Sequence, residues 1–272
     1  MTKVDRARIV AALDEEWDAL LALAEGLTDD EWSLPTACPG WTVRDNLSHC
    51  LGTEAMLLGR PNPDVDLPDD LPHVRNDIGR INELWVESYR GRPPTELMDD
   101  FRAVVAERRA ALAAMDDSEF EAESWTPAGR DTYGRFMRIR VMDQWMHEQD
   151  MREAVGRPGH VEGLAPEAAL DEVVDLLGFV VGKRAAAPAG SSVRFELTGP
   201  MSRRVDVDVA DRARVVDALA GEPDTTITLP GARLMRLIGG RVKDHRARAD
   251  GVNVGGDEKL AQQVLDSLAV MI

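Results

Sequence analysis

The chain has 272 residues, which is enough for two domains with buried cores. It carries 32 Lys and Arg against 49 Asp and Glu, a formal net charge of −17, which argues against nucleic acid or an anionic membrane surface as its main partner. The N-terminal residues lack the apolar core of a signal peptide, and no apolar run approaches a membrane span, so we expect a cytoplasmic protein. Its two cysteines, Cys38 and Cys50, cannot form a disulfide framework and do not have zinc-finger spacing.

Helical patterns dominate the first half of the chain. Apolar residues recur there at helical spacing, and stretches rich in Pro and Gly separate the segments. One helix is expected to start after Thr42, because Thr42 and Asp45 have the spacing of a capping box. The expected helices cover residues 4–27, 43–58, 73–89, 95–115 and 138–152, the last ending near residue 156. No segment before residue 158 shows strong period-two alternation, so an antiparallel helical bundle is predicted for residues 1–158.

Residues 159–272 mix helices with strands. Apolar and polar side chains alternate over residues 192–198 and 204–209, and β-branched side chains fill residues 225–229. Helices are expected at residues 166–183, 230–238 and 257–269. The predicted fold class is therefore α+β, in which the helical bundle is followed by a small domain with an antiparallel sheet covered by helices.

The helix predicted at residues 138–152 carries an unusual polar stripe. Asp143, His147 and Asp150 lie at i, i+4 and i+7, so their side chains stack along one stripe of this helix. On its own such a pattern is typical of a solvated ion pair. His49, in the helix at residues 43–58, adds a second imidazole. Two histidines and one carboxylate from facing helices are the ligand set of an open zinc site or of an iron(II) centre.

The other histidines and both cysteines are expected to have no role at this site. His73 and His160 fall among Pro and Gly in predicted loops, and His245 lies in a basic run, so all three are predicted to be solvated. Cys50 follows a candidate ligand directly, and adjacent helical residues point about 100° apart, so Cys50 is predicted to pack rather than ligate. Cys38 is predicted to be a small, buried apolar residue.

Two segments of the chain resemble a known family. The sequence CPGWTVRD, from Cys38 to Asp45, is followed by His49, and the stripe from Asp143 to Asp150 is followed by Gly-Arg-Pro. These residues closely resemble the mycothiol-dependent maleylpyruvate isomerase family, which belongs to the DinB/YfiT-like superfamily of four-helix bundles. Residues 224–241 and the Gly-Asp pair that opens the last helix are similar to the family's C-terminal domain, a small α/β module similar to sterol carrier protein. The resemblance covers nearly the whole chain.

The resemblance implies a set of site residues and cofactors. It implies a divalent metal, usually zinc, held by His49, His147 and Asp143, and mycothiol as the thiol cofactor. The family's usual carboxylate is Glu, and this chain has the shorter Asp143. Asp150 is a rival ligand, for which we favour a role in orienting an imidazole through a hydrogen bond. The family carries an arginine near its C-terminus that is thought to reach the active site; Arg241 matches it, and the alternative is a surface arginine.

The predicted function is that of an enzyme in which a metal-bound thiolate attacks a small electrophile, as a cis–trans isomerase or as a thiol S-transferase. Both reactions need the same site, where Arg241 would stabilise an enolate or a substrate carboxylate. One alternative is a non-catalytic metal-binding or stress-response module, favoured if Asp150 closes the site as a fourth ligand. Another is a water-activating metallohydrolase, which needs no thiol. The expected partners are the electrophile and a low-molecular-weight thiol, without nucleic acid or membrane, and the chain is expected to be a monomer or a homodimer.

Overall fold

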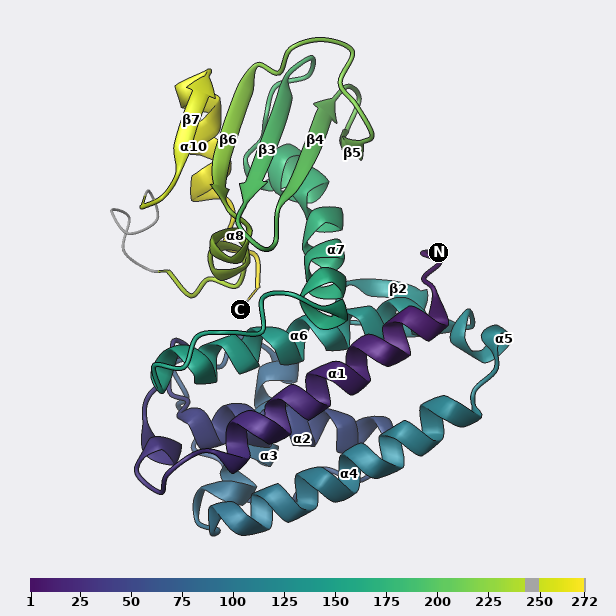
Figure 1. Ribbon diagram of the computed structural model, residues 1–272, viewed down its shortest axis with the longest axis vertical. Helices are drawn as coiled ribbons and strands as arrows, with labels where there is room; N and C mark the ends of the chain where they lie inside the picture. The colour runs from purple at the N-terminus through teal and green to yellow at the C-terminus, as the bar shows by residue number, and fades with distance from the viewer. Residues whose placement is uncertain (243–249, 272) are drawn as a thin grey trace. The chain divides into compact units, whose positions relative to one another are not determined.

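The computed structural model describes residues 1–242 and 250–271 (Figure 1). The chain divides into two compact units, Met1–His160 and Val161–Ile272. The boundary expected from the sequence lies between residues 158 and 159, two residues earlier. The first unit is mainly helical and the second mixes helices with strands, which confirms the predicted α+β fold class. Within the described part of the chain, no helix is both long enough and apolar enough to cross a membrane.

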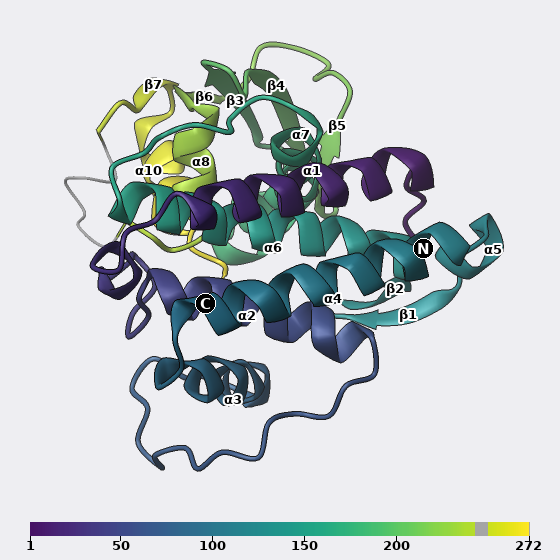
Figure 2. The same ribbon diagram turned by 60° about the horizontal axis from the view of Figure 1, so that its bottom comes forward.

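The long helices of the first unit agree with those predicted. They are α1 (Arg6–Glu25), α2 (Val43–Leu57), α3 (Asp77–Arg90), α4 (Pro94–Ala114) and α6 (Tyr133–Ala154), and a short helix, α5 (Asp117–Phe120), follows α4. α1 packs against α4 and α6, while α2 packs against α3, α4 and α6 (Figure 2). Leu13, Trp17 and Leu20 of α1 are fully buried in this helical core.

Local sequence explains where these helices begin. The predicted capping box of α2 is present: the Asp45 backbone N–H donates to Thr42 Oγ1 at 3.4 Å, and the Thr42 N–H donates to the Asp45 carboxylate at 2.8 Å. α3 begins four residues later than expected, at Asp77, because the Asn76 side chain caps it. The box at the start of α2 places His49 in the second turn of that helix.

A β-hairpin interrupts the first unit. β1 (Glu123–Thr126) pairs antiparallel with β2 (Gly129–Thr132), and α6 starts directly after β2. The bundle predicted for residues 1–158 did not include this hairpin, because strands of four residues are too short to show a clear alternation. The side chain of Thr132 accepts a hydrogen bond from the Arg135 N–H at 3.1 Å, so the hairpin also caps the helix that carries the polar stripe.

The second unit contains a mixed sheet. Its strands are β3 (Ser192–Thr198), β4 (Arg203–Val209), β5 (Ala213–Val216), β6 (Thr225–Pro230) and β7 (Asn253–Gly256), in the spatial order β5-β4-β3-β6-β7. β3 and β6 are parallel, so the prediction of an antiparallel sheet was wrong at this pair. The chain reaches β6 only after the two further strands β4 and β5, and it then returns beside β3 in the same direction.

Helices complete the core of the second unit. They are α7 (Leu164–Phe179), which continues into a π-helical turn (Val180–Arg184), α8 (Gly231–Ile238) and α10 (Glu258–Asp266). α7 packs against β4 and β5, and α10 packs against β6 and β7. Along β3, buried Val193, Phe195 and Leu197 alternate with partly exposed residues such as Arg194, whose guanidinium pairs with Asp206 at 2.7 Å.

Candidate metal centre

Three candidate ligands meet between α2 and α6. His49 Nε2 lies 3.0 Å from Asp143 Oδ2, and His147 Nε2 lies 3.7 Å from Asp143 Oδ1. One ligand atom from each of the three residues lies within 4.8 Å of the other two. We call these residues the His49 cluster. Donors around a tetrahedral zinc, with bonds of about 2.0–2.1 Å, stand about 3.3 Å apart, so these separations fit a single divalent ion.

Asn46 fixes the tautomer of His147. The amide nitrogen of Asn46 donates to the Thr42 carbonyl at 2.8 Å and to Thr36 Oγ1 at 3.0 Å. Its amide oxygen is therefore left to accept from His147 Nδ1, 2.7 Å away. A neutral imidazole with its proton on Nδ1 has its lone pair on Nε2, the nitrogen that faces Asp143. Asn46 was not identified from the sequence, although its position one helical turn before His49 was the available signal.

Asp150 lies on the other edge of the His147 ring. Asp150 Oδ2 is 3.6 Å from His147 Nδ1, and its side chain is fully buried. Cys38 donates to the same carboxylate oxygen at 3.0 Å, and its Sγ lies 3.7 Å from His147 Nδ1. Cys38 is buried as predicted, but it is not simply apolar, because its thiol has polar neighbours more than a hundred residues away in the sequence.

Trp41 lies in the PGWT segment, which is residues 39–42, and contacts both imidazoles. The centroid of its ring lies 5.2 Å from that of His49 and 5.5 Å from that of His147. Its indole N–H donates to the buried carboxylate of Glu83, and His73 Nε2 lies 2.8 Å from the same oxygen. The prediction of a solvated His73 was wrong, because the loop before α3 holds this imidazole against Glu83 with 18% of its side chain exposed.

A buried network of charges flanks Asp143. Arg140, one turn earlier on α6, donates to Asp143 Oδ2 and to Glu54 Oε1, the latter at 3.1 Å. Arg108 donates to the other oxygen of Glu54 at 2.7 Å. Burial alone would raise the pKa of Asp143, but the neighbouring His49 and Arg140 hold it well below its ordinary value. The carboxylate is therefore ionised at neutral pH. Neither Arg140 nor Glu54 was identified from the sequence, because each pairs across helices.

Family models match most of the chain. The Mycothiol maleylpyruvate isomerase N-terminal domain matches residues 13–152, and the MDMPI C-terminal domain matches residues 167–263. The chain belongs to the mycothiol maleylpyruvate isomerase family. This membership confirms the resemblance seen in the PGWT segment and in the polar stripe of α6.

Known proteins with similar sequences and folds agree with this family. Two uncharacterized proteins of Mycobacterium tuberculosis, from two strains, are each 28% identical over 153 residues, or 56% of this chain. The chain spans 58% of the length of these relatives. Crystal structures of the mycothiol-dependent maleylpyruvate isomerase and of a histidine-to-alanine mutant each give a TM-score of 0.59 at 16% identity, covering 94% of this chain and 96% of theirs. These structures share the fold of this family member.

Cys50 and Arg241 are two further residues singled out from the sequence. Cys50 is buried and belongs to no group of candidate ligands among the residues that the structure describes. Burial raises the pKa of its thiol well above the ordinary value. Arg241, the match to the family's C-terminal arginine, follows α8 in the second unit, where its guanidinium donates to the Gly239 carbonyl at 2.6 Å. His245 lies outside the described residues.

A second group of candidate ligands lies in the first unit, between α1 and α6. His160 Nδ1 is 2.6 Å from Glu148 Oε2 and 3.7 Å from Glu16 Oε2. These three residues, the Glu16 cluster, also offer donor atoms within 4.8 Å of one another. The prediction of a solvated His160 was wrong, because 11% of its side chain is exposed and its carbonyl accepts from the Trp145 indole at 2.8 Å. Burial alone would lower the pKa of His160, but its hydrogen bonds to the carboxylates of Glu148 and Glu15 raise it overall.

Proposed function

We propose that this family member is an enzyme that binds a divalent metal, with zinc the expected ion, through His49, Asp143 and His147 and that uses mycothiol. The observation that carries the proposal is the convergence of these three donors within 4.8 Å from two packed helices. Two imidazoles and one carboxylate form a donor set of open catalytic metal sites. Membership in the mycothiol maleylpyruvate isomerase family supports the choice of thiol.

The position of Asp150 supports an open site. Asp150 faces Nδ1 of His147, whereas Asp143 faces Nε2. The two nitrogens of one imidazole point in different directions, so an ion held at Nε2 is not reached by Asp150. Three protein ligands leave a coordination position for a thiol or for water. The closed site required by a non-catalytic module is disfavoured by this arrangement.

The residues around the His49 cluster suit such a centre. A bound metal would lower the pKa of a thiol at the open position and supply a thiolate at neutral pH. Asp143 is ionised and so contributes one negative charge to the donor set. Asn46 keeps the His147 proton on Nδ1, and Trp41 covers one side of both imidazoles.

The proposed reaction is isomerisation of a cis double bond in a small electrophile such as maleylpyruvate, or transfer of the thiol to such an electrophile. Both reactions involve a substrate that develops negative charge or carries a carboxylate. A guanidinium with its paired donors binds such a group well, so we assign this role to Arg241 on the strength of the family resemblance.

Metal analysis of purified protein tests the proposed site. We expect His49→Ala and His147→Ala each to contain about one equivalent of metal per chain less than the wild type, because three ligands are needed for a stable site. His73→Ala, which removes an imidazole outside both clusters, is the matched control and should keep the wild-type content. Wild-type metal content in both His49→Ala and His147→Ala would rule out the His49 cluster.

Turnover assays separate the reaction classes. Purified protein is given maleylpyruvate and a panel of other electrophiles, with and without mycothiol. We expect turnover only with mycothiol, and a loss of about a hundredfold or more in His49→Ala. Hydrolysis without any thiol would instead support a metallohydrolase. Absence of turnover in a protein with bound metal would support a binding module.

A further inference from the structure

The Glu16 cluster contains a buried carboxylate that accepts no hydrogen bond from the part of the chain that the structure describes. Glu16 is on α1, Glu148 is on α6, and His160 follows α6. Both glutamates are fully buried. Neither carboxylate oxygen of Glu16 accepts a hydrogen bond from any residue within 1–242 or 250–271, although Oε2 is directed at His160 Nδ1, 3.7 Å away. A buried polar group without a partner destabilises the folded state, so a cation bound at this position would stabilise the Glu16 carboxylate.

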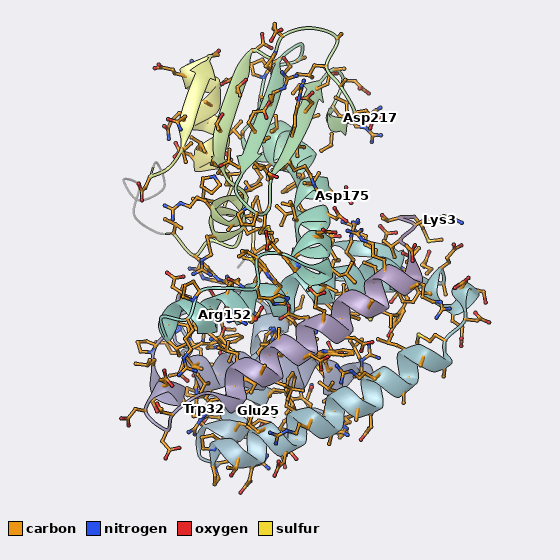
Figure 3. The ribbon with its side chains drawn as sticks, in the orientation of Figure 1. Lys3, Glu25, Trp32, Arg152, Asp175 and Asp217 are labelled. Atoms are coloured by element: carbon orange, nitrogen blue, oxygen red, sulfur yellow. The ribbon has the colours of Figure 1, made fainter. Side chains whose placement is uncertain are left out.

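The outer side of the cluster is already held by hydrogen bonds. The second ring nitrogen of His160, Nε2, lies 3.2 Å from Glu15 Oε1. The second carboxylate oxygen of Glu148 accepts from Arg152 Nε at 2.7 Å; Figure 3 labels Arg152 on α6. Histidines that bind metals commonly donate their other N–H to a carboxylate, and ligating carboxylates are themselves hydrogen-bonded. Glu15 and Arg152 therefore orient His160 and Glu148 in the way that outer hydrogen bonds orient the ligands of known metal sites.

We propose that the Glu16 cluster binds a divalent ion of the first transition row, such as Zn²⁺ or Mn²⁺, through His160 Nδ1 and one oxygen each of Glu16 and Glu148. One imidazole with two carboxylates suits these ions, whereas Ca²⁺ and Mg²⁺ take oxygen ligands. The ion replaces the proton that His160 shares with Glu148, and the two carboxylates balance its charge. It also gives the Glu16 carboxylate a close partner, where the described residues supply no hydrogen bond.

This second site has a structural role. Its ligands come from α1, from the end of α6 and from the chain that follows α6, so the ion cross-links three segments of the first unit. An ion that binds only the folded state raises the thermal midpoint of unfolding in a concentration-dependent way. The proposal does not depend on the His49 cluster, since the two sets of ligands have no residue in common.

The test uses the full chain with the His49 cluster disabled by His49→Ala and Asp143→Ala. The protein is stripped with a chelator, dialysed against Zn²⁺ or Mn²⁺ and analysed for bound metal. We expect about one equivalent per chain, since one ligand set remains. Adding Glu16→Gln, which keeps the size of the side chain, should reduce the binding affinity at least tenfold.

The matched control is Glu25→Gln in the same double variant. Glu25 lies at the exposed end of α1, where Figure 3 labels it, and it pairs with Arg102 at 2.9 Å. Its replacement should leave the bound metal unchanged. His160→Gln provides a second variant, at the partly exposed edge of the cluster, should Glu16→Gln fold poorly, and it should also lose the metal.

Thermal unfolding gives an independent readout. Added Zn²⁺ or Mn²⁺ should raise the midpoint of the double variant and of its Glu25→Gln form, and should leave the midpoint unchanged after Glu16→Gln or His160→Gln. Two results would overturn the proposal: no metal bound by the double variant at saturating Zn²⁺ and Mn²⁺, or equal metal content after Glu16→Gln, His160→Gln and Glu25→Gln. The second result would place the ion at another group, such as Cys38 with His147 and Asp150.

Discussion

The ring of His147 separates two carboxylates that lie on the same helix. Asp143 lies near its Nε2, and Asp150 lies near its Nδ1 together with Asn46. Since Asn46 accepts the proton of Nδ1, the two carboxylates face different chemical groups of one side chain. We therefore expect Asp143 to be the carboxylate ligand, and Asp150, beside Asn46 at the Nδ1 edge, to support the ring rather than to bind the ion.

Matched substitutions on α6 test these roles. Asp143→Asn should weaken zinc binding more than a hundredfold, because it removes a charged ligand. Asp150→Asn should weaken it by only about 10–100-fold, the usual effect of losing a group that orients a ligand. Competition with a chromophoric chelator measures the zinc affinity of each variant. The relevant affinity is that of the ion at the His49 cluster, which is identified as the equivalent of metal that His49→Ala loses. The opposite order of effects would make Asp150 the ligand.

Prediction from sequence succeeded for residues whose helix was evident. Helical periodicity and the family resemblance together named His49, Asp143 and His147, and the structure brings them within 4.8 Å of one another; their role as ligands stays a prediction. The hydrogen bond of Cys38 to Asp150 and that of Arg140 to Glu54 were missed, because each joins residues that are far apart in the sequence. A buried contact across helices leaves no periodic signal in the sequence.

At the scale of elements, the β1–β2 hairpin connects the N-terminal residues to the start of α6. Asp131 of β2 accepts hydrogen bonds from the Thr2 N–H and, at 2.8 Å, from Thr2 Oγ1. It also accepts from the Thr132 N–H and from Arg135, each at 2.9 Å. Burial alone would raise the pKa of Asp131, but these donors lower it well below its ordinary value. The ionised carboxylate of Asp131 therefore stabilises the fold by an amount that depends on pH.

Asp131→Asn should show the sign of this contribution. A carboxyl whose pKa is lower in the folded than in the unfolded state stabilises the fold above the unfolded value of about 3.9, and this stability is lost as the pH falls below it. We expect the variant to lose about 1–3 kcal/mol of unfolding free energy at pH 7. The loss should shrink at about pH 3, where the unfolded wild type binds the proton.

Urea denaturation at both pH values measures this difference. Asp117→Asn is the control, because Asp117 pairs with Arg6 through an exposed side chain and should contribute less than about 1 kcal/mol. If Asp131→Asn lost the same unfolding free energy at both pH values, the contribution of these hydrogen bonds would not depend on the charge of Asp131.

Long helices and strands were predicted from the sequence, whereas short strands were missed. The five long helices of the first unit were all expected, because each repeats its apolar face over several turns. The strands β1, β2, β5 and β7, each of four residues, were missed. Four residues are too few for a period-two alternation to stand out, even where the partner strand is the next one along the chain, as in β1 and β2.

At the scale of the whole molecule, the family match extends over both units. The α+β class was predictable because helical and alternating patterns occupy different halves of the chain. The parallel pairing of β3 with β6 was not, since it depends on the route of the chain between them. The likeness of the second unit to sterol carrier protein stays a prediction. The candidate ligands lie in the first unit and Arg241 lies in the second, so the role of Arg241 is a question about the molecule as a whole.

Arg241→Ala tests whether chemistry at the His49 cluster needs a residue of the second unit. We expect unchanged metal content and a fall in mycothiol-dependent turnover of about 10²–10³, as found when a group that stabilises developing charge is removed. Arg212→Ala, at an exposed position of the same unit, is the control and should retain full turnover. Equal turnover of the two variants would make Arg241 a surface residue.

The two buried cysteine thiols, Cys38 and Cys50, have a consequence for how the proposed enzyme would be regulated. Burial raises the pKa of the Cys50 thiol, and the buried Cys38 thiol donates a hydrogen bond to Asp150, so neither side chain is assigned as the nucleophile of the proposed reaction. The thiolate of the proposed reaction would then come from a diffusible molecule. The rate would follow the concentration of reduced thiol in the cell, and oxidation of that pool would slow the enzyme without any change to the protein itself.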